Sequence, residues 1–125
     1  MIHKFQKFLN RKGILSSFVG TNQTLLQFSC YEINYLFEYD SEADPSFVRI
    51  LVPRVKQIEV DKENLQELYI LTRNYKVGKA FLVNEQVWFS ADAFVYGNAD
   101  CESLFERLLL VLRDMFEEYK EKNHG

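Results

Sequence analysis

Three acidic residues near the middle of the chain have a spacing that can bind a cation. Asp40, Glu42 and Asp44 occupy alternate positions, as the first three ligands of a calcium-binding loop do. The glycine and the bidentate glutamate that complete such a loop are replaced here by Pro45 and Leu51. The segment therefore predicts a solvated turn between two strands, and we expect no metal site.

The residue types that most often catalyse reactions have unsuitable surroundings in this sequence. The two histidines, His3 and His124, lie close to the chain ends, where side chains are seldom held in place. Cys30 and Cys101 are far apart and have no CxxC neighbour, so we interpret both as small buried hydrophobic residues. The sequence predicts a protein that is not an enzyme and that binds no cofactor.

Composition limits the partners that the protein can have. The chain has 125 residues, of which 47% are hydrophobic, and this predicts one folded domain over residues 1–125. Its formal net charge of −3 disfavours nucleic acid as a partner. No stretch approaches the roughly 18 apolar residues of a membrane span, and charges near the start replace the apolar segment of a signal peptide. We expect a cytoplasmic protein that does not bind membranes.

Hydrophobic periodicity predicts the elements that must position any functional residue. The expected helices run from Ile2 to Lys12, from the N-cap Asp61 to Asn74, and from about Asp100 to Lys122. The expected strands are 25–30, 33–39, 47–52, 79–83 and 86–95. The third strand should stop at Pro53, whose missing N–H cannot serve a central ladder. The fold class is thus α+β, an antiparallel sheet packed with helices in the order α-β-β-β-α-β-β-α.

The junction after the middle helix is the strongest local signal. The segment Asn74-Tyr75-Lys76-Val77-Gly78-Lys79 joins that helix to the second predicted hairpin. We expect Asn74 and Gly78 to form a structural turn, with Gly78 in the left-handed conformation that glycine adopts easily. The buried stripe of this helix is predicted to contain Leu65, Leu68, Tyr69, Thr72 and Tyr75.

This junction and the order of the elements together resemble the YbjN family of bacterial proteins, whose fold is similar to that of type III secretion chaperones. The resemblance covers nearly the whole chain. In it, Asn74 and Gly78 match as helix-ending residues, Tyr75 as a packing residue and Lys79 as the first residue of a strand. The resemblance implies a frequently homodimeric α+β sandwich that binds other proteins or acts in regulation, and it carries over no active-site residue.

Three apolar residues are candidates for an interface. Ile70 and Leu110 fall among polar residues on their predicted helices. Trp88 and Phe89 are adjacent in one strand and must point to opposite faces of the sheet, so one of them can be exposed. The last helix also has an apolar stripe wider than packing on one sheet face needs, and this feature, like the resemblance, predicts a homodimer.

Two hypotheses about function follow from these features. The first is a noncatalytic protein-binding module, either chaperone-like or a regulatory adaptor, which presents a sheet edge or an apolar groove to another polypeptide. The second is a ligand-binding regulatory domain whose aromatic interior holds a small apolar molecule. The aromatic residues expected to line that pocket are Tyr31, Tyr35, Phe37, Tyr39, Trp88 and Phe94.

Overall fold

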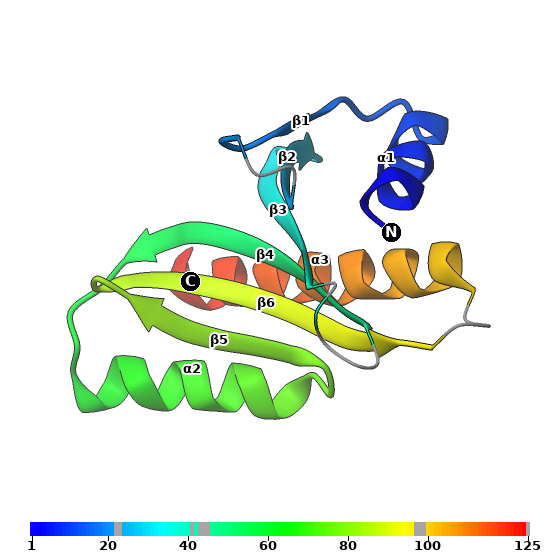
Figure 1. Ribbon diagram of the computed structural model, residues 1–125. Coiled ribbons are helices and arrows are strands. Elements are labelled where there is room, and N and C mark those ends of the chain that lie inside the picture. Colours follow the sequence, from blue (N-terminus) through cyan, green and yellow to red (C-terminus); the bar gives the residue numbers. More distant parts are fainter. Residues whose placement is uncertain (22–23, 41, 43–45, 97–99, 125) are drawn as a thin grey trace.

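Six antiparallel strands form one sheet in the order β1-β2-β3-β4-β6-β5, and three helices pack against it (Figure 1). The computed structural model describes residues 1–21, 24–40, 42, 46–96 and 100–124. The helices are α1 (Ile2–Arg11), α2 (Lys62–Asn74) and α3 (Cys101–His124). The strands are β1 (Ser16–Phe18), β2 (Leu25–Cys30), β3 (Ile33–Asp40), β4 (Ser46–Gln57), β5 (Gly78–Val83) and β6 (Gln86–Val95). The predicted fold class is confirmed, and the short strand β1 is an addition to the predicted order.

Local signals in the sequence determine where the helices begin and end. The carboxylates of Asp61 and Asp100 accept hydrogen bonds from backbone N–H groups in the first turns of α2 and α3. At the end of α1, Gly13 has a φ of +75°, and the N–H groups of Gly13 and Ile14 donate to carbonyls of the last turn. Within the described residues, no helix is long and apolar enough to cross a membrane.

Both predicted hairpins are confirmed. Tyr31 and Glu32 connect β2 to β3, and Asn84 and Glu85 connect β5 to β6. All four residues have positive φ, between 50° and 66°. Two-residue turns of this kind match the right-handed twist of the strands, although glycine usually supplies the positive φ.

Strand β4 continues past Pro53, so the predicted end of this strand is wrong. The register between β4 and β6 shifts between Val52 and Lys56, and Arg54 has a φ of +48° inside this irregularity. The bulge interrupts the ladder at the point where proline has no N–H to donate. A proline is therefore tolerated in a strand that lies between β3 and β6.

The core lies on one face of the sheet, between the strands and the helices α1 and α3. Phe5 of α1 is fully buried and stacks on Phe37 of β3, with ring centroids 3.9 Å apart. Its edge also meets Phe105 of α3 at 4.8 Å. At the other end of α3, Tyr119 packs edge-on against Phe89 of β6 at 5.6 Å. The opposite sheet face, toward the viewer in Figure 1, is not covered by α1 or α3.

Helix α2 lies along the edge strand β5 instead of stacking squarely on the sheet (Figure 1). The Thr72 hydroxyl accepts a hydrogen bond from the Ala80 N–H at 2.9 Å and donates to the Ala80 carbonyl at 3.4 Å. Leu68 and Leu71 are the buried residues of α2. The predicted buried stripe of α2 is thus partly wrong. The side of α2 that carries Thr72 faces the edge of β5, so Leu65 and Tyr69 point toward solvent and are 44% and 61% exposed.

Gly78 does not form a left-handed turn, so this prediction is also wrong. Among the glycines that the structure describes, positive φ occurs at Gly13 and Gly20 only. Gly78 is the buried first residue of β5, and a Cβ atom there would overlap the Sδ of Met115 in α3. Glycine is needed here for the close approach of a strand to a helix. Asn74 ends α2 as predicted, and its side-chain amide donates to Glu118 of α3 at 3.5 Å.

Candidate functional site

An open groove of about 580 Å³ lies where α3, the end of α1 and the β2–β3 turn meet. In Figure 1, α1 and this hairpin lie above the N-terminal half of α3. The groove is lined by Lys12, Ile14, Cys30, Tyr31, Tyr35, Glu106, Leu109, Leu110 and Arg113. We call it the α3 groove, and its size falls within the range of binding sites in proteins.

Exposed apolar side chains collect in and beside the α3 groove. Leu110 is 57% exposed and Tyr31 is 73% exposed. Leu15, which follows the groove residue Ile14, is 89% exposed. Apolar groups that gather on the surface, unlike a single exposed leucine, commonly mark an interaction site.

The groove has two walls, formed by α3 and by the β2–β3 hairpin, and different interactions position them. On α3, the side chains of Phe105, Leu108 and Leu112 are buried in the core, so Leu110 points outward by helical periodicity. On the hairpin, Tyr31 occupies a turn position with a φ of 52°, which is uncommon for an aromatic residue. The Arg113 guanidinium lies 4.4 Å from the centroid of the Tyr31 ring and joins the two walls.

Both charged and neutral side chains line the groove. The Lys12 ammonium pairs with the Glu106 carboxylate at 2.7 Å. Burial raises the pKa of the Cys30 thiol, and the opposing effects of Arg113 and Lys12 are smaller. Burial also raises the pKa of Tyr35 to about 12. Both groups therefore stay protonated near neutral pH, which suits binding and makes Cys30 a poor nucleophile.

Only one of the three candidate interface residues lies in the groove. Leu110 is one of its lining residues. Ile70 is partly buried on α2, and Trp88 is partly buried on the opposite face of the sheet, 6.5 Å from the Phe81 ring. Phe89 is the core member of the Trp88–Phe89 pair, which confirms the predicted alternation. The Trp88 indole N–H is buried and has no acceptor in the part of the chain that the structure describes.

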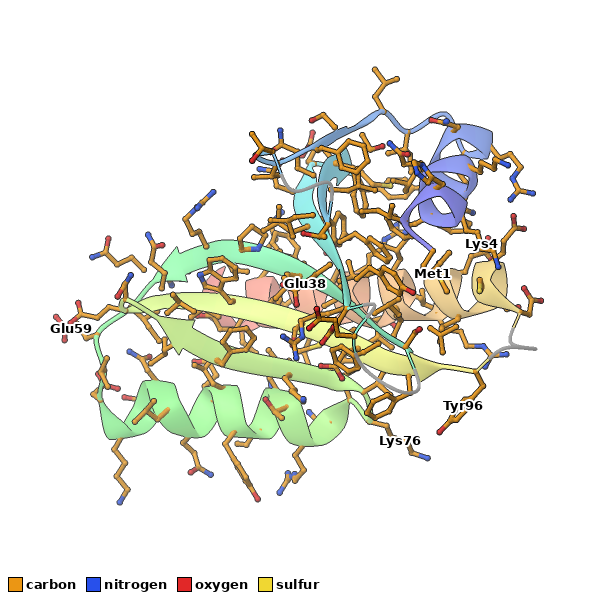
Figure 2. The ribbon with its side chains drawn as sticks, viewed as in Figure 1. Met1, Lys4, Glu38, Glu59, Lys76 and Tyr96 are labelled. Atoms are coloured by element: carbon orange, nitrogen blue, oxygen red, sulfur yellow. The ribbon has the colours of Figure 1, made fainter. Side chains whose placement is uncertain are left out.

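The open face of the sheet carries a charge cluster that the sequence did not reveal. The Asp92 carboxylate lies 3.4 Å from both the Arg49 and the Lys79 side chains, and Arg49 also approaches Glu38, labelled in Figure 2, at 3.8 Å. These residues come from β3, β4, β5 and β6, so only the strand register brings them together. The opposite charges neutralise one another, and we assign the cluster no role in binding.

The aromatic residues expected to line one pocket are distributed over separate clusters. Phe37 packs in the core against Phe5, whereas Phe94 pairs with Phe47 and Trp88 with Phe81. Tyr39 shares a hydrogen bond with Ser46 at 3.3 Å. Tyr31 and Tyr35 are the members of this set that line the α3 groove.

The remaining candidates for metal binding or catalysis are the acidic residues near the end of β3 and the two cysteines. The Asp40 carboxylate accepts a hydrogen bond from the Glu42 N–H at 3.0 Å, whereas Asp44 and Pro45 lie outside the described residues. In the described ranges, no group of three or more His, Cys, Asp or Glu residues could hold a metal ion. Cys30 and Cys101 are partly exposed, so the prediction that both are buried is wrong.

Comparison with known proteins assigns no family to this chain. No protein-family model matches the sequence, and no curated protein matches it. We therefore infer function from the geometry and chemistry of the α3 groove.

Proposed function

We propose that the protein is a noncatalytic protein-binding module, chaperone-like or a regulatory adaptor, which acts as a homodimer and binds polypeptide at the α3 groove. One observation carries this proposal: Leu110 is 57% exposed in a groove that is lined by both apolar and charged side chains. An apolar anchor surrounded by polar groups is typical of protein interfaces. The resemblance to the YbjN family and to type III secretion chaperones supports the same function.

The charged side chains of the groove favour a polypeptide over a small apolar molecule. Its lining has charges of both signs, from Lys12, Glu106 and Arg113. A polypeptide can offer apolar side chains to the apolar lining residues and charged side chains to these three, whereas a small apolar molecule uses only the apolar ones. The aromatic residues also do not surround a single space, which removes the main support for a ligand sensor.

Leu110→Glu should weaken association and leave the protomer stable. Wild-type protein should have about twice the 14.8 kDa chain mass in light scattering at tens of micromolar. The variant should shift toward the chain mass, with a dissociation constant raised about tenfold or more, because an unpaired carboxylate is costly to bury. Its melting temperature should stay close to that of the wild type, since the side chain is solvent-exposed in the protomer.

Leu65→Glu is the matched control, because Leu65 is a 44% exposed leucine of α2 that does not line the groove. It should change neither mass nor melting temperature. A wild-type protein that stays monomeric at these concentrations would contradict the homodimer. If Leu110→Glu lowers the melting temperature strongly, Leu110 belongs to the core and the groove has no exposed anchor.

A further inference from the structure

The outward side of α3 is a charged ridge with a leucine at its centre. Its exposed residues include Glu106, Arg107, Arg113 and Asp114, which flank Leu110. At about 100° per residue, Glu106 and Arg113 fall on the groove side of Leu110, and Arg107 and Asp114 fall on the other side. Each side of the ridge therefore carries one cation and one anion, in opposite order along the helix.

We propose that the polypeptide bound at this surface is α3 of a second copy of the chain, packed antiparallel with a two-fold axis at Leu110. This inference rests on the proposed function and names its partner. A two-fold axis at this point brings the same side of each helix together with the residue order reversed. Arg107 then faces Asp114 of the second copy, and Glu106 faces Arg113 of the second copy. Symmetry repeats each attractive pair, and the two Leu110 side chains meet at the centre.

The charges also select the antiparallel orientation over the parallel one. Glu117 lies two turns after Leu110, almost in line with it on the exposed side of α3. In a parallel pair, Glu117 faces its own copy, and the two carboxylates repel each other. In the antiparallel pair it faces Ser103, which is neutral, and the ridge brings no like charges together between Glu106 and Asp114.

The side of the ridge away from the groove should contribute most to this contact. Within the described residues, neither Arg107 nor Asp114 has an ion-pair partner, so both charges are available to a second copy. Glu106 and Arg113 are already engaged within the protomer, by Lys12 and by the Tyr31 ring. Charge changes at Arg107 and Asp114 therefore test the pairing without disturbing the groove.

Charge reversal and its rescue test this pairing. Arg107→Glu and Asp114→Arg should each raise the dissociation constant of the full-length dimer about tenfold or more, because each turns two attractive contacts into repulsive ones. The double variant restores both contacts with reversed polarity and should return the constant to within about threefold of wild type. Sedimentation velocity at low and high salt measures this, and salt should reduce the effect of the single changes.

Arg73→Glu on α2 is the control, since it changes the net charge as Arg107→Glu does but lies outside the ridge. A wild-type dimer that the single changes do not weaken would overturn the α3 pairing and leave the proposed function standing. A double variant weaker than either single variant would overturn the antiparallel arrangement. A monomeric wild-type protein would overturn the pairing together with the homodimer of the proposed function. If the variants melt close to the temperature of the wild type, a lower sedimenting mass reports the loss of the interface and not unfolding.

Discussion

Phe5→Ala is expected to lower the free energy of unfolding by about 3–5 kcal/mol. Phe5 is fully buried, and its ring contacts Phe37 and Phe105 at 3.9 and 4.8 Å. Helix α1 has ten residues, too few to be stable alone, so it depends on this contact for its place on the sheet. Urea denaturation followed by circular dichroism measures the change.

Phe94→Ala is a suitable control, because Phe94 is 54% exposed and should cost less than about 1 kcal/mol. A loss for Phe5→Ala as small as that of the control would mean that α1 does not hold the core together. If α1 detaches instead, the groove loses Lys12 and Ile14, and the dimer should weaken with it.

Gly78→Val is expected to lower the free energy of unfolding by about 1–3 kcal/mol through overpacking. The first carbon of the new side chain would overlap the Sδ of Met115, and Val111 and Tyr75 lie at 3.1 and 3.2 Å. The structure thus attributes the cost to crowding between β5 and α3 and not to backbone conformation. Thermal or urea unfolding would detect a change of this size.

A double-mutant cycle with Met115→Ala separates crowding from backbone strain. If crowding is the cause, removing the Met115 side chain makes room, and the double variant should be more stable than the sum of the single effects predicts. Additive losses would show that Met115 is not what excludes a side chain at position 78. The cycle is measured by the same unfolding experiment.

The elements that local chemistry specifies were predictable from the sequence. Asp61 and Asp100 cap their helices as expected, and the alternation around Phe89 assigns the correct side chain to the core. Each of these features depends on a few neighbouring residues. Such predictions from neighbouring residues are correct where the packing of the fold agrees with the local preference of the sequence.

Three of the failed predictions depend on where distant elements meet. Proline should end a central strand, but a bulge against β6 accommodates Pro53. Gly78 was expected to form a turn, and its small size serves a contact with Met115 of α3 instead. The predicted stripe of α2 does not include Leu71, which is buried, because the periodicity of a helix does not show which of its sides meets a strand edge.

Only part of the candidate site could be predicted from the sequence. Leu110 interrupts a polar helical face, and this single signal was enough to select it. Ile14 and Leu15 give no signal in the sequence, since they lie in the connection between α1 and β1, whereas Tyr31 is predicted only as part of an aromatic pocket. They become part of one surface only when α1 and the β2–β3 hairpin fold over α3.

The hydrogen bonds of Thr72 to β5 bear on how the protein behaves when it is crowded. Sheets nucleate insoluble aggregates by pairing exposed edge strands from different molecules. Here α2 lies along the edge strand β5, and the opposite edge strand, β1, is only three residues long. Neither edge is a good template for strand recruitment. A protein that leaves an apolar groove exposed can therefore accumulate to high concentration without polymerising through its sheet.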